Sequence, residues 1–275
     1  MVINTNVLSL NAHRAMKNVS AAQTQASQRL SSGLRINSAA DDAAGLAISE
    51  KMRSQIRGLD MASKNAQDAS SLVQTAEGGM QQIDSMVQRM RELVVQASND
   101  TNQVDDREKI GEELLQLTAE IDSMASRVEF NERKLLNGSV GTLYMQIGAN
   151  ESQGIEFNVG GMTAGDLGLA GIASAVTSAT SGSDITGLIS VLDNGLKQVT
   201  GARSTLGAIQ NRLDYTMKSL DISSENLSAA ESRIRDTDMA KEMMNLTKTN
   251  VLSQAATSML SQANQSPQNI LQLLK

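Results

Sequence analysis

The sequence predicts a mainly α-helical protein, an elongated antiparallel coiled-coil bundle formed by its N- and C-terminal segments, with a small β-hairpin region in the middle. Apolar residues recur over long segments at alternating spacings of three and four, which is typical of helices packed along a continuous seam. Only four of the 275 residues are Phe or Tyr, none is Trp, and Pro267 is the single proline. Aromatic residues normally fill compact cores and proline interrupts helices, so this composition favours long helices packed through small side chains.

Two helical segments are expected at the ends of the chain. Near the start, a seam with steps of four and three runs through Leu8, Ala12, Ala15, Val19, Ala22 and Ala26. Near the end, an interrupted seam begins at Met239 and continues through Met243, Leu246, Leu252, Ala256, Met259 and Ala263. We expect the two segments to pair with each other. The residues from Leu8 to Ala26 and from Met243 to Ala263 are the predicted assembly seam.

A longer helical segment follows, with a heptad pattern that continues without a missed step over residues 59–97, even across Gly78-Gly79. Asp41-Asp42 lies where this helix would begin, where carboxylates complement the positive end of the helix dipole. A polar run at residues 99–105 predicts a turn, and a third seam occupies residues 110–128. The second and third helices should therefore form an antiparallel hairpin.

The fourth seam occupies residues 185–227 and includes three polar members, Arg203, Gln210 and Ser224. Between the third and fourth seams the pattern changes to alternation, with apolar residues at 143, 145 and 147 and again at 155, 157 and 159. This alternation predicts a β-hairpin near residues 142–160. The following Ser/Thr/Gly-rich stretch near residues 171–184 predicts an exposed loop, either a solvated turn or a carrier of O-linked sugars.

The side chains needed for catalysis are missing. The chain has no cysteine, and its one histidine, His13, lies beside Arg14 in a helical segment without a partner base or acid. The acidic pairs lack the spacing of a calcium loop. We therefore expect no enzyme activity, no metal and no cofactor.

The net charge of −6 and the pI near 5.0 disfavour nucleic-acid binding. No apolar run approaches the roughly 18 residues that cross a bilayer, so membrane insertion is not expected. The start of the sequence also lacks the pattern of a cleavable signal peptide.

Several long blocks resemble bacterial flagellin, in a short form without outer variable domains. They are MVINTNVLSLNA at the start, RLSSGLRINSAADDAAGLAISEKMRSQIRGL at residues 29–59, QRMRELVVQASN at residues 88–99, SENLSAAESRIRDTDMAKEM at residues 224–243 and QANQSPQNILQLLK at the close. The blocks cover about a third of the chain and follow the family's order. Similarity between unrelated coiled coils would not reproduce their glycine and Asn/Asp positions.

The resemblance implies a structural subunit that self-polymerises into the extracellular bacterial flagellar filament used for motility. Residues 1–43 with 236–275 would form an inner coiled-coil domain, the filament core, and residues 44–235 a rod-like helical domain. The partners implied are many copies of the chain itself, an export chaperone on the C-terminal segment, and the junction and cap proteins of the flagellum. Export would use the flagellar secretion channel without a cleavable signal peptide.

The resemblance also implies one of two roles for Arg89, Leu93 and Glu113. In many flagellins the matching positions contact a vertebrate toll-like receptor, and alternatively they form contacts between neighbouring subunits. Some receptor-activating members carry an arginine where this sequence has Leu117.

Two other classes of protein share parts of the pattern. A hook–filament junction protein has the same general plan but forms a short ring, and the match at both termini favours the filament subunit. A signalling coiled coil would need continuous helices and usually a membrane anchor, and the β-hairpin pattern disfavours it.

Overall fold

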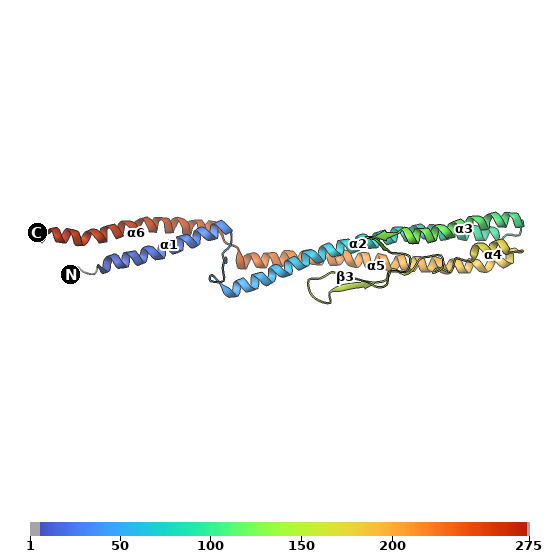
Figure 1. Cartoon of the computed structure of the whole chain (residues 1–275), viewed down its shortest axis with the longest axis horizontal. Helices are drawn as coiled ribbons and strands as arrows, with labels where there is room; N and C mark the ends of the chain where they lie inside the picture. Colours follow the sequence, from blue (N-terminus) through green and yellow to red (C-terminus); the bar gives the residue numbers. More distant parts are fainter. Residues whose placement is uncertain (1–5, 274–275) are drawn as a thin grey trace. The chain divides into compact units, whose positions relative to one another are not determined.

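A computed structural model describes residues 6–273, with side-chain surroundings for residues 6–265 (Figure 1). In chain order the elements are α1 (Val7–Ser32), α2 (Ala43–Ala97), α3 (Val104–Arg127), β1 (Glu129–Phe130), β2 (Arg133–Lys134), β3 (Leu143–Gln146), β4 (Gly154–Phe157), α4 (Ile172–Ser178), α5 (Gly182–Arg235) and α6 (Met239–Leu273). The predicted fold class, mainly α with long antiparallel helices and a small hairpin region, is confirmed.

The chain forms two compact units, which we call the terminal unit and the central unit. The terminal unit comprises residues 1–56 and 225–275, and the central unit comprises residues 57–224. The sequence placed these boundaries after residues 43 and 235, so the terminal unit includes more of α2 and α5 than expected. Ion pairs join these helix ends within it, from Arg53 Nε to Glu231 Oε1 at 3.2 Å and from Arg235 to Glu50.

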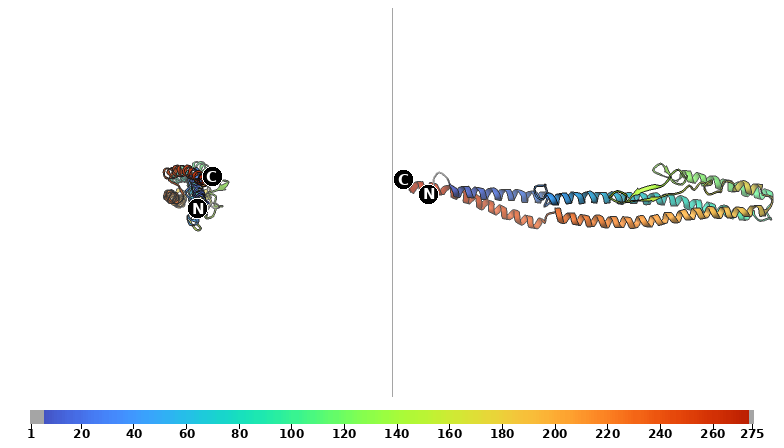
Figure 2. Two further views of the ribbon diagram at one scale, coloured as in Figure 1. Left: turned by 90° about the vertical axis from the view of Figure 1, so that its left-hand side faces the viewer. Right: turned by 90° about the horizontal axis from the view of Figure 1, so that it is seen from below.

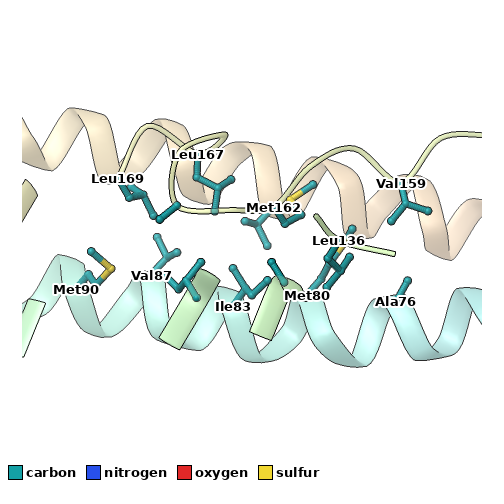
Figure 3. Packing of buried hydrophobic residues seen from close by; sticks show 14 of the residues in the cluster. Ala76, Met80, Ile83, Val87, Met90, Leu136, Val159, Met162, Leu167 and Leu169 are labelled. Atoms are coloured by element: carbon teal, nitrogen blue, oxygen red, sulfur yellow. The ribbon is translucent and has the colours of Figure 1, made fainter. Parts of the chain in front are cut away.

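The core of the central unit follows the heptads of α2 and α5. From Ala62 to Ala97, every seam residue predicted on α2 is buried. Along α5, every seventh residue is buried from Ile185 to Leu220, in the order Ile185, Leu192, Val199, Leu206, Leu213 and Leu220. Figure 3 shows the α2 side of this core packed against residues from the segments between α3 and α4, among them Leu136, Met162 and Leu169.

Gly79 explains why α2 continues through two adjacent glycines. A Cβ atom on Gly79 would lie 2.7 Å from a methyl group of Val128 and 2.8 Å from one of Leu136. The glycine therefore lets the end of α3 and the segment after it approach the α2 backbone closely. Packing outweighs the roughly 1 kcal/mol that a glycine costs inside a helix.

Arg203 forms a polar layer in the seam of the central unit. Its guanidinium reaches Asp84 Oδ2 on α2 at 3.3 Å and Glu77 Oε1 at 3.9 Å. Gln88 Nε2 donates to the same Asp84 oxygen at 3.2 Å. A charged group among apolar layers favours one register of two helices, since any other register leaves it without its partner.

The predicted hairpin is present as β3 and β4, which pair antiparallel with Leu143 opposite Phe157 and Met145 opposite Ile155. Leu143, Ile155 and Phe157 face the core, whereas Tyr144 is half exposed on the other face. A shorter hairpin, β1 with β2, turns through Asn131 and Glu132, both in the left-handed backbone region.

The exposed loop predicted near residues 171–184 is wrong. Most of this stretch is the helix α4 and the first turn of α5, and α4 buries Ile172, Ala173 and Val176 against α3. The apolar positions 172, 173 and 176 share one helical face, and the frequent Ser and Thr residues lie between them. The composition of the stretch concealed this short amphipathic helix.

A buried arginine joins the turns at the α2–α3 end of the central unit. The side chain of Arg107 is only 4 % exposed, and it donates to Ala97 O at 3.2 Å, Thr180 O at 3.0 Å and Asp100 Oδ1 at 3.0 Å. Asp100 Oδ1 also accepts the Gly182 N–H at 2.7 Å. We call these four chain positions with Arg107 the tip clasp. The Gly182 N–H, followed by Arg107, lowers the pKa of Asp100 below its ordinary value of 3.8.

Candidate assembly surface

Helices α1 and α6 of the terminal unit have well-marked starts. The Asn6 side chain accepts the Ser9 N–H at 3.1 Å, and Asp238 Oδ1 accepts the N–H groups of Ala240 and Lys241 at 3.0 and 3.1 Å. α1 ends at Gly33, whose φ of 72° is the left-handed conformation of a helix C-cap. These local signals fix where the two helices begin and where α1 ends.

Backbone hydrogen bonds join the residues that follow α1 to the residues that precede α6. Leu34 and Asp236 form an isolated antiparallel bridge, Arg35 N donates to Arg235 O at 2.7 Å, and Thr237 N donates to Gly33 O at 3.0 Å. From there α1 and α6 run side by side, as Figures 1 and 2 show from different directions.

The seam between α1 and α6 has a regular heptad pattern, but five of its thirteen members are polar. The least exposed residues of α1 step by three and four through Ser9, Ala12, Met16, Val19, Gln23 and Ala26. Those of α6 step likewise through Glu242, Leu246, Thr249, Ser253, Ala256, Leu260 and Ala263. Ala26 and Ala263 are the only fully buried apolar residues among them, at 3 % exposure each.

Hydrogen bonds cross this seam along its length. Asn6 Nδ2 donates to Ala263 O at 2.8 Å, and Gln23 Nε2 donates to Asn250 Oδ1 at 2.7 Å. Near the other end, Arg29 lies 4.0 Å from the buried carboxylate of Glu242. With so little apolar area buried, the pairing of α1 and α6 gains little hydrophobic stabilisation.

The predicted assembly seam divides into two groups in the structure. Six residues lie in the seam between α1 and α6: Ala12, Val19, Ala26, Leu246, Ala256 and Ala263. The other six are exposed: Leu8, Ala15, Ala22, Met243, Leu252 and Met259. The prediction chose apolar residues at every step, whereas the seam also contains polar residues such as Gln23, Thr249 and Ser253. A heptad search that accepted small polar residues would have found them.

The outer surface of α1 and α6 is therefore rich in exposed apolar side chains. The large ones are Val7, Leu8, Leu10, Met239, Met243, Met244, Val251, Leu252 and Met259, each between 44 and 67 % exposed. At about 100° per residue, one flank of α6 carries Met244, Val251, Leu252, Ala255 and Met259. We call these five residues the outer stripe. A continuous exposed apolar surface of this kind indicates a contact with another molecule.

The link between α1 and α2 is organised by Asp41. Its Oδ2 accepts the N–H groups of Asn37 and Ser38 at 3.2 and 3.0 Å, and its Oδ1 accepts Gln25 Nε2 from α1 at 3.1 Å. These hydrogen bonds, led by that of the Ser38 N–H, lower the pKa of Asp41 below its ordinary value of 3.8. Of the acidic pair that the sequence placed at the start of α2, only Asp42 contacts that helix, where it accepts the Gly45 N–H at 2.9 Å.

A pH-dependent opening of this link is expected. Because the folded-state pKa of Asp41 is lowered, its carboxylate stabilises the link above pH 3.8, and this contribution is lost as the pH falls through the folded-state pKa. Amide exchange of Asn37 and Ser38 should accelerate over that acidic range beyond the intrinsic pH effect. Asp41→Asn should exchange rapidly at every pH. An unchanged pH profile in that variant would show that Asp41 does not hold the link.

The residues predicted for receptor or subunit contact lie on α2 and α3. Arg89 Nε and Nη2 donate to Glu113 Oε1 at 3.0 and 2.9 Å, and Arg89 Nη1 donates to Glu92 at 3.1 Å. The hydrogen bonds that Arg89 donates to Glu113 are the main reason why the pKa of Arg89 is raised. Leu93 is only 2 % exposed and belongs to the core. Arg89 and Glu113 thus meet each other, while Leu93 is not on the surface.

Within residues 6–273, no three acidic or histidine side chains are grouped so that they could hold a metal ion. None of the helices in that part of the chain is long and apolar enough to cross a membrane. His13 is exposed on α1. Of the exposed large apolar side chains in the described part of the chain, nine lie on α1 and α6.

Comparison with known proteins agrees with the arrangement of paired terminal helices. The family model for the bacterial flagellin N-terminal helical region matches residues 3–141, and the model for the C-terminal helical region matches residues 189–274. Flagellin from Halalkalibacterium halodurans is 52 % identical and flagellin from Bacillus subtilis is 47 % identical, each with full coverage of both chains.

A solved structure described as a flagellar hook-associated protein from Vibrio parahaemolyticus shares the fold. It superposes with a TM-score of 0.61 at 14 % identity, covering 71 % of this chain and all of that one. At that identity the likeness concerns the fold alone, whereas the full-length matches to flagellins are much closer in sequence. The chain therefore belongs to the bacterial flagellin family and is a structural subunit of the flagellar filament, not an enzyme.

Proposed function

We propose that this subunit polymerises through the outer surface of α1 and α6, with the outer stripe of α6 as the continuous apolar contact that neighbouring copies cover in the filament core. The observation that carries the proposal is that these helices use different residues for their mutual seam and for their outer surface. Their mutual seam buries only small apolar side chains fully and includes five polar residues, while nine large apolar side chains face outward. Covering each large side chain contributes about 1.5–3 kcal/mol, so stacking of many copies supplies the stabilisation that the pair lacks.

The same exposed surface supports the remaining partners. Before export, a cytoplasmic chaperone covers the C-terminal segment, residues 236–275, of which residues 274–275 lie outside the described residues. The exposed methionines and Leu252 of α6 are the apolar anchors for it. Export then follows the flagellar secretion channel, and the filament ends bind the junction and cap proteins of the flagellum.

For Arg89, Leu93 and Glu113, the geometry supports a role in packing α2 against α3. Leu93 is buried, and the guanidinium of Arg89 already binds Glu113 and Glu92. A toll-like receptor would meet only the exposed parts of this ion pair, and Leu117, four residues after Glu113, stands where some receptor-activating flagellins carry an arginine. Contact between neighbouring subunits remains the alternative use of its exposed atoms.

Seeded growth tests the proposed assembly. Purified chain mixed with short filament fragments should add to their ends and give helical rods much longer than the seeds, as seen by electron microscopy. The monomer without seeds serves as the control. Closed rings or discrete dimers in place of rods would contradict the proposal and favour a junction-type protein.

A further inference from the structure

The methionines of this chain fall into two environments. In the central unit, Met80 and Met90 are fully buried and Met162 is 5 % exposed. On α6, by contrast, Met239, Met243, Met244 and Met259 are between 48 and 67 % exposed. The thioether sulfur atoms of α6 are therefore open to small reagents in solution, while those of the central core are shielded.

The four methionines of α6 lie on different flanks of the helix. Met244 and Met259 belong to the outer stripe, in which Val251 and Leu252 lie between them. Met239 and Met243 are four residues apart, so they share one face, and that face lies on the opposite flank beside polar residues such as Gln254. Only Met244 and Met259 interrupt a continuous apolar surface if they become polar.

We propose that Met244 and Met259 form an oxidation site at which a hydroperoxide blocks subunit addition to the filament. This inference rests on the proposed assembly through the outer surface of α1 and α6. Each thioether sulfur attacks one oxygen of hydrogen peroxide, the O–O bond breaks, and the products are a sulfoxide and water. The sulfur loses two electrons, and the peroxide gains them.

The reaction changes the outer stripe at its two ends. A sulfoxide is a polar, chiral group with a strong acceptor oxygen, and it has no donor available inside an apolar contact between copies. Each sulfoxide should raise the monomer concentration needed for elongation by about tenfold or more, because a buried apolar side chain is lost from every contact. The folded monomer itself should be unaffected, since both side chains are already in water.

The test uses monomer treated briefly with hydrogen peroxide, with peptide mass spectrometry to locate each added oxygen. Oxygen should appear first at the exposed methionines of α6 and at the exposed Met61 of α2, and not at Met80 or Met90. Oxidised wild-type chain should then fail to elongate seeds at concentrations that suffice for untreated chain. Methionine sulfoxide reductases of both epimer specificities should restore elongation.

Two matched variants locate the effect, both carrying Met61→Leu. In one, M244L/M259L, elongation should survive peroxide, whereas in the other, M239L/M243L, it should be lost as in the wild type. Survival in M239L/M243L with loss in M244L/M259L would overturn the assignment, as would normal elongation of oxidised wild type. Elongation of untreated wild-type chain is scored separately, so a failure of the proposed assembly is distinguished from a failure of the oxidation site.

Discussion

Met259→Asp should abolish seeded filament growth while leaving the monomer folded. Met259 is 60 % exposed on the outer stripe and makes no contribution to the seam between α1 and α6, so a carboxylate there is harmless in the monomer. In the polymer it would be an unpaired charge in an apolar contact, which costs several kcal/mol. The monomer concentration needed for elongation should rise by roughly a hundredfold or more.

Gln254→Asp is the matched control for this variant. Gln254 is exposed on the same helix but on the flank opposite the outer stripe, and its side chain forms no hydrogen bond in the described part of the chain. It should elongate seeds far better than Met259→Asp. Helicity measured by circular dichroism should match the wild type in both variants. Normal filaments from Met259→Asp, or equal loss in both, would show that the outer stripe is not the assembly contact.

Arg107→Ala should destabilise the central unit by about 2–4 kcal/mol. The change removes all three hydrogen bonds of the tip clasp made by the guanidinium, so the carbonyl groups of Ala97 and Thr180 lose their donors and Asp100 loses its cation. The free energy of unfolding, measured by urea denaturation, gives the loss of stability. Amide exchange of α3 provides a second measurement of the same loss.

An arginine on the surface of the same helix provides the comparison. Arg127 is 60 % exposed and pairs with the exposed Glu120, so Arg127→Ala should cost less than about 1 kcal/mol. Arg107→Ala should still elongate seeds at temperatures where its central unit stays folded, because the tip clasp is remote in sequence from the outer stripe. Equal destabilisation by the two alanine variants would refute the role of the tip clasp.

The sequence was most informative where a set of positions served a single structural purpose. In the central unit the α2 seam from Ala62 to Ala97 and every seventh residue of α5 from Ile185 to Leu220 are Ala, Val, Ile, Leu or Met, and all of them are buried. Core packing was the only demand on those positions. The hairpin of β3 and β4 was predicted for the same reason, since its alternating residues face one core.

In the proposed assembly the terminal helices serve two contacts, and the sequence could not assign residues to each. Both faces of α6 carry apolar residues, so the spacing of Met243, Leu252 and Met259 suited a seam that in fact contains Thr249 and Ser253. Arg89 and Leu93 show a similar limit, because their four-residue spacing places them on one face but does not reveal that the core boundary passes between them. Arg107 gave no signal, since two of its three partners are backbone carbonyl groups and the turns that bring Ala97 O and Thr180 O together are far apart in sequence.

The ion pair between Arg203 and Asp84 has a mechanical consequence for a subunit of a filament. Sliding α5 along α2 by one heptad would move the guanidinium by about 10 Å and leave Asp84, which is 8 % exposed, without its cation. Apolar layers alone would tolerate such a slip, because one heptad resembles the next. The central unit should therefore resist sliding of α5 along α2 and stay stiff under force along its helices.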